Sequence, residues 1–315
     1  MGMRTIGRTQ LAVTELGFGA SGIGNLGHAV SDDVAMEAVR AAWDTGIRLF
    51  DTAPHYGLGL SERRLGAALA GVPRREFVLS TKVGRLIRPN PLATGADDAG
   101  GFSVPDDFTR VWDFSADGVR RSLAESLERL GMDRIDIVYV HDPDDAVDQA
   151  IAEAIPALIA LRDAGVVSAV GVGMNQSQAP LRFVRETDID VVMLAGRWTL
   201  LDRSGELLLN ECLERGVGVV AAAPFNSGIL ARRWPSGDDA YDYGATPPEV
   251  LERARGFASI CESAGTTLPT AALQYPLRHP AVASVVVGLR TREQVTLASS
   301  SLAQPISHEV WQRLG

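Results

Sequence analysis

The 315-residue chain is predicted to fold as a (β/α)8 barrel, that is, a TIM barrel, with an N-terminal β-hairpin and long loops on its C-terminal face. Short apolar runs alternate with amphipathic stretches from one end to the other, and eight such runs favour a closed parallel barrel over an open doubly wound sheet. No linker or low-complexity tract divides the chain, and such barrels commonly reach roughly 250 residues or more. We therefore expect one domain over residues 1–315.

The expected elements follow in order along the chain. Residues 4–13 alternate like a small hairpin, which we expect to plug the bottom of the barrel. Helices begin near polar capping residues: Ser31 precedes a helix to Thr45, Ser61 precedes one to Ala70, and Ser115 precedes a long helix that stops before Gly131. Further helical patterns cover residues 146–164, 178–186, 204–215 and 248–264. The eight predicted strands lie near residues 16–19, 47–50, 77–81, 135–140, 167–172, 190–195, 217–222 and 283–287.

Three segments do not fit the repeat: residues 84–114, residues 225–247 and the tail after residue 301. Long connections without regular structure are usually functional, and the first two follow strands, so they belong to the face where barrel active sites lie. Their aromatic side chains suit a pocket that stacks on a ligand ring, although covering the core is an equal interpretation for each of them. These are Phe102, Phe108, Trp112, Trp234, Tyr241 and Tyr243.

Composition excludes several classes of protein. The net charge of -9 disfavours nucleic acid and anionic membrane surfaces as partners, and no apolar run approaches the roughly 18 residues of a membrane span. The N-terminus lacks an apolar signal core, so we expect a cytoplasmic protein. Cys212 and Cys261 are expected to be buried and reduced. We expect no metal, because the run from His141 to Asp145 lacks ligand spacing, and no obligate protein partner is indicated.

A glycine pattern near the N-terminus tests the main rival fold. Residues 17–22 read GFGASG and satisfy G-x-G-x-x-G, which occurs in dinucleotide-binding open sheets. In that motif a helix begins directly after the glycines, whereas the next predicted helix here begins only at about Asp32. We therefore reject the Rossmann fold, while noting that glycines still let backbone approach a flat ligand.

Four ionisable residues come at or just after the ends of three apolar runs. Asp51 and Tyr56 lie in FDTAPHYG, Lys82 ends FVLSTK, and His141 ends IDIVYVH. A free phenol with a pKa of ~10 is a sluggish acid or base, so a nearby cation is needed. Lys82 would supply this charge and favour the phenolate, Asp51 would pair with Lys82, and His141 would orient a substrate oxygen. Each residue alone has an ordinary structural explanation, but together they predict a proton-transfer site.

At these residues the sequence resembles the aldo-keto reductase superfamily of (β/α)8 barrels that use a nicotinamide cofactor. The resemblance extends over LGFGAS, RLFDTAPHYGLGLSERRLGAAL, VLSTKVG, DGVRRSLAESLERLGMDRIDIVYVHD, GVVSAVGVGMN and SVVVGLRTREQV. It implies that Asp51, Tyr56, Lys82 and His141 form the catalytic tetrad, with Tyr56 as general acid or base. The histidine at position 141 is similar to the one found in the branch of the family that acts on alcohols and carbonyls.

Other segments, such as YVHDPDD, LAGRWTLLD and APFNSGIL, look most like the aldose 1-dehydrogenases of the L-fucose and D-threo-aldose type and the pyridoxal 4-dehydrogenases. The resemblance implies oxidation of a ring hydroxyl at C1 of a sugar to a lactone. Polar groups such as Asp142 and Arg197 suit a polyol. Alternatives are a general aldehyde or ketone reductase, a Schiff-base aldolase using Lys82, and a non-catalytic nicotinamide-sensing subunit. The expected substrate-binding residues are His55, Tyr56, His141, Trp112 and Trp198.

The resemblance also implies where NAD or NADP would bind, without choosing between them. Asn175 matches the residue that grips the carboxamide, whereas Met174 replaces the family's serine. Ala195 stands where many relatives have glutamine, and Ala222 stands where an aromatic stacks on the nicotinamide, so Trp198 or Phe225 is expected to supply that face. Arg290 would bind a 2'-phosphate or face solvent. The expected cofactor-binding residues are Gly19, Ala20, Asp51, Asn175, Ala195, Phe225, Asn226, Gly228, Leu230, Gly288, Arg290 and Gln294.

Overall fold

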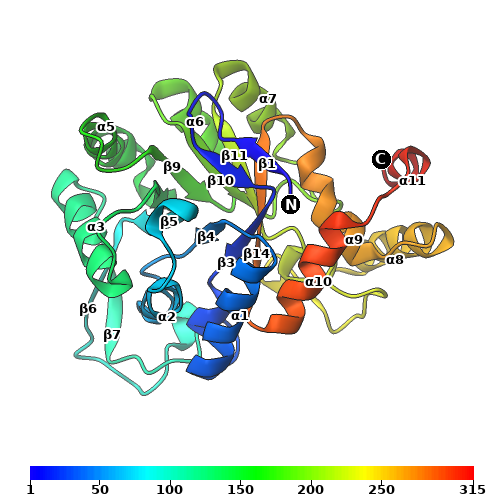
Figure 1. Ribbon diagram of the computed structural model, residues 1–315, viewed down its shortest axis with the longest axis horizontal. Helices are drawn as coiled ribbons and strands as arrows, with labels where there is room; N and C mark the ends of the chain where they lie inside the picture. The colour runs from blue at the N-terminus through cyan, green and yellow to red at the C-terminus, as the bar shows by residue number, and fades with distance from the viewer.

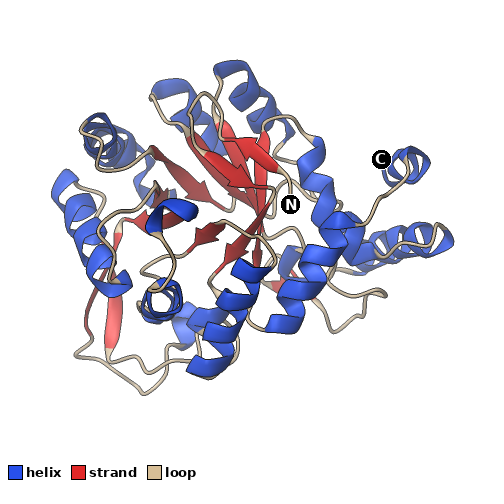
Figure 2. Cartoon of the chain, viewed as in Figure 1, coloured by secondary structure: helices blue, strands red, loops and turns tan.

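The computed structural model describes residues 1–315 apart from the side chain of Ala99. Its described strands include eight parallel ones that close into a barrel in the order β10-β11-β14-β3-β4-β5-β8-β9, with helices around it (Figures 1 and 2). Each of the eight predicted apolar runs coincides with or overlaps one of these strands, so the predicted barrel is confirmed. The strands are β3 (Leu16–Gly19), β4 (Leu49–Asp51), β5 (Val78–Val83), β8 (Ile137–His141), β9 (Ala169–Met174), β10 (Val191–Ala195), β11 (Gly218–Ala222) and β14 (Val282–Gly288).

The helices lie outside the strands and mostly match their predicted positions. Ser31 and Ser115 cap α1 and α3 by accepting hydrogen bonds from the first-turn amides, and α3 ends at Gly131 with φ 62. Ser61 is not a cap, since α2 begins at Leu60 and the Ser61 hydroxyl donates to the Ala20 carbonyl. The helices are α1 (Asp32–Asp44), α2 (Leu60–Leu69), α3 (Ala116–Leu130), α4 (Val147–Gln149), α5 (Ile155–Asp163), α6 (Gln178–Glu186), α7 (Glu206–Arg215), α8 (Pro248–Ser263), α9 (Leu268–Gln274), α10 (Arg292–Ala303) and α11 (His308–Leu314).

One predicted helix is less regular than expected. The pattern over residues 146–164 predicts one helix, but the chain forms a 3-10 turn, Asp144–Ala146, then α4, a π-helical stretch, Ala150–Ala154, and α5. Side-chain periodicity near 3.6 does not distinguish a π turn from an α turn over five residues, because the register changes by only one residue. The segment still covers the barrel as predicted.

The N-terminal hairpin closes the barrel at the amino ends of its strands. Strands β1 (Met3–Thr5) and β2 (Ala12–Thr14) pair antiparallel, and Ile6 and Val13 are completely buried in the cluster that fills the barrel interior. Arg4 donates to the carbonyls of Leu277 and Val282, which fixes the hairpin below β14. The hairpin lies in front of the strands in Figure 1. The predicted plug is therefore confirmed, and it leaves the opposite end for the site.

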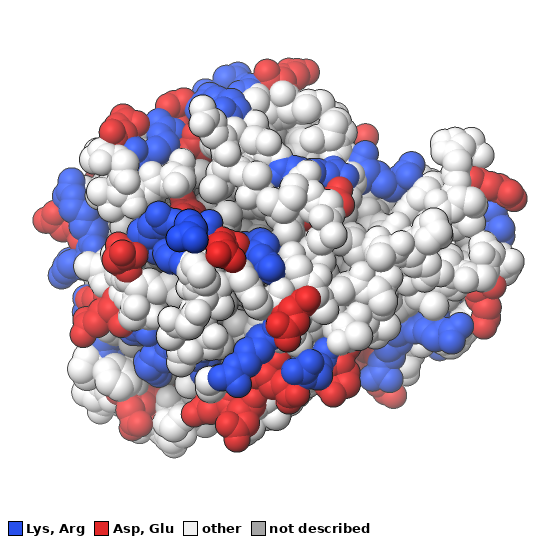
Figure 3. Space-filling model, in the orientation of Figure 1, with Lys and Arg blue, Asp and Glu red and all other residues white. Residues whose placement is uncertain are grey.

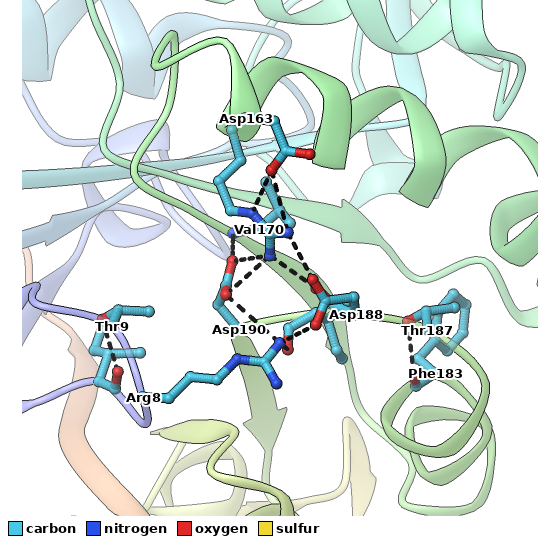
Figure 4. A network of polar contacts seen from close by, with 11 residues as sticks. Arg8, Thr9, Asp163, Val170, Phe183, Thr187, Asp188 and Asp190 are labelled. Atoms are coloured by element: carbon cyan, nitrogen blue, oxygen red, sulfur yellow. Dashed lines mark hydrogen bonds and ion pairs between the residues drawn. The ribbon is translucent and has the colours of Figure 1, made fainter.

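A charged network holds the hairpin tip to the loop before β10 (Figure 4). Arg8 pairs with Asp188, while Arg162 at the end of α5 donates to Asp188 at 2.7 Å and to both oxygens of Asp190 at 3.0 Å. Asp190 is buried and also accepts from the Val170 amide at 3.0 Å. Because several donors satisfy this buried carboxylate, the network holds the hairpin to the amino ends of the barrel strands.

The segments that did not fit the repeat contain structure that the sequence patterns did not reveal. Residues 84–114 form an antiparallel ribbon of β6 (Arg85–Pro89) and β7 (Phe108–Trp112), so the expectation of a connection without strands was wrong. Residues 225–247 include a short 3-10 turn, Asn226–Gly228, and the small pair β12 (Ala240–Tyr241) and β13 (Gly244–Ala245). In the tail, α10 continues to Ala303 and α11 follows. The ribbon begins directly after β5 and rises beside the carboxyl ends of β4 and β8.

The surface and the thiols agree with the composition. Figure 3 shows acidic and basic side chains interspersed over the visible face, without a field of one sign. Cys212 and Cys261 are free and buried, and burial raises the pKa of their thiols to about 12 and about 11. Such thiols are unreactive near neutral pH, as expected. Among the described residues, no helix is both long and apolar enough to cross a membrane.

Candidate active site

A buried ion pair forms the floor of the site. Lys82, in β5, donates to Asp51 Oδ2 at 2.7 Å and to the Thr52 carbonyl at 3.0 Å, and Ser80 donates to the other Asp51 oxygen at 2.7 Å. Both charged residues are 2% exposed. Burial by itself lowers the pKa of Lys82, but the Asp51 carboxylate and the Tyr56 oxygen together raise this pKa more. The ammonium therefore remains charged at physiological pH.

Tyr56 lies above this pair in the turn that follows β4. The turn is tight: Gly57 has φ +61, and a Cβ there would lie 2.2 Å from the Gly24 carbonyl oxygen, so only glycine fits. Lys82 Nζ is 4.8 Å from the centre of the Tyr56 ring. Burial raises the pKa of Tyr56, and Lys82 opposes this increase only in part. Lys82 therefore favours the phenolate, as expected, but burial outweighs its effect, so Tyr56 is a neutral phenol at neutral pH.

His141 ends β8 and faces Tyr56. The two rings are 6.0 Å apart and nearly perpendicular, at 88°. Burial, followed by the positive charges of Arg85 and Lys82, lowers the pKa of His141 well below its usual value, so the imidazole is neutral. No described residue bonds its buried Nδ1, and its Nε2 is 3.5 Å from Asp142 Oδ2, beyond a good hydrogen bond. This ring has hydrogen-bonding capacity left for another molecule.

The structure thus brings together the four residues of the predicted proton-transfer site, which form a quartet: Asp51, Tyr56, Lys82 and His141. They come from β4, the turn after it, β5 and β8, and these three strands are neighbours in the barrel. A neutral phenol, a charged ammonium fixed by a carboxylate, and a neutral imidazole surround one small region. Such a group can give a proton to a carbonyl oxygen or take one from a hydroxyl while the imidazole holds that oxygen.

Two arginines beside the quartet were not singled out from the sequence. Arg85 donates to Asp142 Oδ2 at 2.6 Å, and its guanidinium lies 5.5 Å from the centre of the Trp112 ring. Arg110 forms a two-pronged ion pair with the buried Asp97, with both contacts at 2.6 Å. The only sequence signal for Arg85 was its place just after the β5 strand end. Arg110 and Asp97 had none, because the ribbon that positions them was not recognised.

The aromatic residues of the long loops divide into two groups. Phe102 is 4% exposed and packs on Tyr56 and His55, with ring centres 6.1 and 5.2 Å away. Trp112 is 58% exposed on β7, above Arg85, so it stands at the rim. The remaining four contact neither the quartet nor these residues through any interaction seen here: Phe108, Trp234 and Tyr243 are exposed, and Tyr241 packs against the core.

Trp198 does not lie where the sequence placed it. Its indole donates to the Pro276 carbonyl at 3.3 Å, and its ring lies 5.5 Å from both Tyr275 and His279. It is buried in the main apolar core, two residues after the left-handed Gly196, which has φ +70. The expectation that Trp198 binds substrate or covers the nicotinamide is therefore corrected. Phe225, half-buried after β11, is the candidate that remains.

The segments expected to bind the cofactor gather after β9, β10, β11 and β14. Asn175 is exposed just past β9, and its carbonyl accepts from Arg197, which also pairs with Asp202 and Asp242. Ala195 and Ala222 are register partners at the ends of β10 and β11. Asn226 is buried and ties the loop to its neighbour by accepting from Thr199 and donating to the Gly196 carbonyl. Here Asn226 holds the loop rather than presenting its amide.

Small residues leave room beside these segments. A Cβ at Gly228 would meet nothing within 4 Å, and a Cβ at Gly288 would come no closer than 3.4 Å to Ser21 Oγ. Gly19 packs against β14, the Ala20 amide donates to the Asp51 carbonyl, and Leu230 is buried in the core. At the far end Arg290 donates to His28, and Gln294 accepts from the Arg290 amide. The open glycines and alanines at these strand ends leave space that fits a flat nicotinamide.

A closed parallel barrel with this quartet at the carboxyl ends of its strands defines a class of protein, the (β/α)8-barrel enzymes that move a proton at a substrate oxygen. The chain belongs to the aldo/keto reductase family, whose sequence model matches residues 15–315. It is therefore an oxidoreductase that uses a nicotinamide cofactor.

Two relatives and one solved structure show how far the likeness extends. The chain is 50% identical to a D-threo-aldose 1-dehydrogenase from Pseudomonas sp, covering 96% of this chain and 94% of that protein. It is 38% identical to a pyridoxal 4-dehydrogenase from Microbacterium luteolum, covering 99% and 96%. The holo form of an aldo-keto reductase from Bacillus halodurans superposes with a TM-score of 0.78 at 28% identity, covering 100% and 95%. The likeness is therefore to whole enzymes rather than to one motif.

Proposed function

We propose that this protein is an NAD(P)-dependent aldose 1-dehydrogenase that oxidises the C1 hydroxyl of a ring-form sugar of the L-fucose or D-threo-aldose type to a lactone. The observation that carries the reaction type is the meeting of Tyr56, the Lys82–Asp51 pair and a neutral His141 in one place. The substrate class is supported by the 50% identity to a D-threo-aldose 1-dehydrogenase over nearly the whole chain. The ligands are thus a small molecule and a cofactor.

In the proposed reaction each residue has one task. Tyr56 takes the proton of the C1 hydroxyl when it is a phenolate, and returns a proton to the carbonyl oxygen in the reverse direction. Lys82 makes the phenolate easier to reach, and Asp51 keeps this ammonium compensated in a buried place. His141 holds the reacting oxygen without adding a charge. The bound nicotinamide would exchange a hydride with C1.

The choice between the two cofactors rests on the end of the site beyond β14. Arg290 lies there, and burial lowers the pKa of its guanidinium, as expected for a cation without a carboxylate partner. A 2'-phosphate would compensate this charge, whereas the hydroxyl of NAD would not. This residue supports a preference for NADP, which kinetics with each cofactor would test directly.

Two other functions within the same chemistry have support of their own. The 38% identity to a pyridoxal 4-dehydrogenase favours an aromatic alcohol or hemiacetal as an alternative substrate, for which the exposed Trp112 at the rim offers a stacking face. The raised pKa of Tyr56 favours proton donation, and this is the direction of a general aldehyde or ketone reductase. Both alternatives keep the quartet and change only the substrate.

One experiment separates these functions. The enzyme is incubated with L-fucose, D-arabinose, L-galactose and pyridoxal, each with NAD⁺ and with NADP⁺, and the reduced nicotinamide is followed by its absorbance. Simple aldehydes with NADH and NADPH test the reductase. The sugars are expected to react best, and absence of turnover on every sugar would contradict the proposed substrate.

The same assay tests the role of Tyr56. Tyr56→Phe is expected to lose at least about 10²-fold in kcat, the usual contribution of a general acid or base, while cofactor binding measured by calorimetry is unchanged. Tyr275→Phe is the matched control, because Tyr275 is also buried but packs against Trp198 and Arg203 away from the quartet. Retained turnover in Tyr56→Phe would remove this residue from the mechanism.

A further inference from the structure

Arg110 reaches across from the β6–β7 ribbon to the residue next to the catalytic tyrosine. Its Nε is 2.5 Å from His55 Nδ1, and its Nη2 donates to the His55 carbonyl at 3.0 Å. The remaining donors of Arg110 bind both oxygens of Asp97 at 2.6 Å. Arg110 and Asp97 are less than a tenth exposed. The guanidinium is therefore fixed between a carboxylate on one side and His55 on the other.

This contact determines which nitrogen of His55 carries the proton. A guanidinium has only donors, so Nδ1 must accept and cannot hold a hydrogen. Burial, followed by the charges of Arg85 and Arg110, lowers the pKa of His55 to about 2, so the ring does not become an imidazolium. Lys82 is the third cation acting on this ring. A neutral ring with an accepting Nδ1 has its hydrogen on Nε2.

His55 lies beside the quartet. Its ring centre is 5.7 Å from that of His141 and 6.0 Å from that of Tyr56, while Phe102 covers another side at 5.2 Å. No described residue accepts a hydrogen bond from Nε2. A half-buried donor that lies close to Tyr56 and His141, and that no described residue uses, has the chemistry to bind a hydroxyl or ring oxygen of a substrate.

The Arg110–Asp97 clamp has little freedom to change this arrangement. A Cβ at Gly100 would lie 2.4 Å from an Asp97 oxygen and 2.6 Å from Arg110 Nη1, so the surrounding backbone closes around the pair. Phe102 forms single β-bridges with both Asp97 and Leu26, which fixes the loop beneath the pair. The clamp thus holds His55 from a preformed frame, and this spares the substrate the entropy of ordering the ring.

We propose that His55 binds the substrate through Nε2–H, at an oxygen next to the reacting carbon, and that Arg110 and Asp97 are positioning residues that fix this tautomer. This inference rests on the proposed function, because a substrate with oxygens on neighbouring carbons is what would use a second donor beside His141. It assigns the loop over residues 84–114 a part in choosing polyhydroxylated substrates over simple aldehydes.

The test compares the clamp in two backgrounds. Arg110→Met with Asp97→Asn removes the clamp without leaving a lone buried charge, and it frees His55 to exchange tautomers. We expect KM for the sugar to rise about tenfold, the loss of roughly one hydrogen bond, with kcat changed less than about threefold. KM for an aldehyde without hydroxyls is expected to stay constant.

The second background is His55→Gln. The amide of this glutamine donates from the position of Nε2 and has no tautomer to be fixed, so removing the clamp should change KM for the sugar by less than about twofold. A tenfold change in both backgrounds would show that the clamp only supports the loop, and would overturn the proposal.

The tautomer is measured independently of turnover. In nitrogen NMR spectra of histidine-labelled enzyme, His55 is expected to remain the neutral Nε2–H form from pH 5 to 8. Without the clamp it is expected to show both neutral tautomers, with its pKa still below the ordinary value because burial, Arg85 and Lys82 remain. A protonated Nδ1 in the unmodified enzyme would overturn the assignment. Arg88→Met is the matched control, because Arg88 lies on the same ribbon but pairs with Glu125, so KM and the spectrum should not change. If the enzyme oxidises no aldose, the proposed function fails, whereas the NMR result stands on its own and the KM comparison moves to pyridoxal.

Discussion

Replacement of Lys82 by methionine tests the idea that the Asp51–Lys82 pair is mutually dependent. At the 2.7 Å separation of Nζ and Oδ2, two unit charges in an effective dielectric of about 20 attract by about 6 kcal/mol. Bringing both ions out of water costs several kcal/mol each, so the pair contributes little net stability. Removing Lys82 alone cancels the attraction but leaves the Asp51 carboxylate buried with only Ser80 as a side-chain donor.

We therefore expect Lys82→Met to lower the free energy of unfolding by about 3–5 kcal/mol, the usual result of orphaning one buried charge. Asp51→Asn should cost a similar amount, and the double variant should recover most of the loss. The Tyr56 pKa should rise further in Lys82→Met, because the cation that opposes burial is gone, so oxidation should fail at neutral pH.

The assay is urea unfolding followed by circular dichroism and fluorescence, with the two probes checked for coincidence because a chain of this size can unfold through intermediates. Arg185→Met is the matched control, since Arg185 and Glu211 form a surface pair and should contribute at most about 1 kcal/mol. A loss below about 1 kcal/mol for Lys82→Met, or a double variant as unstable as the sum of the singles, would refute the reasoning.

Two further predictions concern pH and packing. Because burial raises the pKa of Tyr56, the phenolate needed for oxidation is scarce at pH 7. We therefore expect kcat/KM for the sugar to increase with pH into the alkaline range, while kcat/KM for carbonyl reduction decreases. An oxidation rate that falls above pH 8, in an enzyme still folded by circular dichroism, would contradict the assigned base. Gly66→Ala should destabilise the protein by about 1–3 kcal/mol, because the new Cβ would lie 2.0 Å from the Leu130 carbonyl oxygen. Gly256→Ala in α8, where a Cβ would meet nothing within 4 Å, should instead stabilise the protein by about 0.5–1 kcal/mol. Thermal unfolding compares the two variants, and equal effects would show that close packing of α2 on α3 is not the cause.

Local patterns were sufficient for the barrel and the quartet because both obey rules that act over short distances. An apolar run that ends on Asp51, Lys82 or His141 marks a buried strand and places its last side chain at the carboxyl edge. Parallel strands that succeed one another along the chain become neighbours, so β4, β5 and β8 had to bring these ends together. No long-range information was needed to predict that Lys82 and Asp51 meet.

The environment of the same residues was decided only by the fold. Lys82 favours the phenolate of Tyr56, as the sequence predicts, but the net direction of the pKa shift is set by burial of the ring, against which Phe102 from a distant loop packs. In the sequence, Trp198 is a candidate for the nicotinamide face because Ala222 supplies no aromatic there, whereas in the fold its ring packs against Tyr275 and His279 in the core. The desolvation of Tyr56 and the path of the loop after β10 each depend on many residues at once, so a local sequence pattern does not predict them.

The architecture, the family and the four side chains proposed to react could all be predicted from the sequence, since periodicity, strand ends and motif spacing are local. Their surroundings follow from the fold as a whole: the ribbon after β5, the Arg110–Asp97 clamp, and the position of His55 beside Tyr56. The contact between Arg110 and His55 spans 55 positions and joins a loop to a turn. Neither segment has a periodic pattern that would predict its partner, so this contact follows from packing alone.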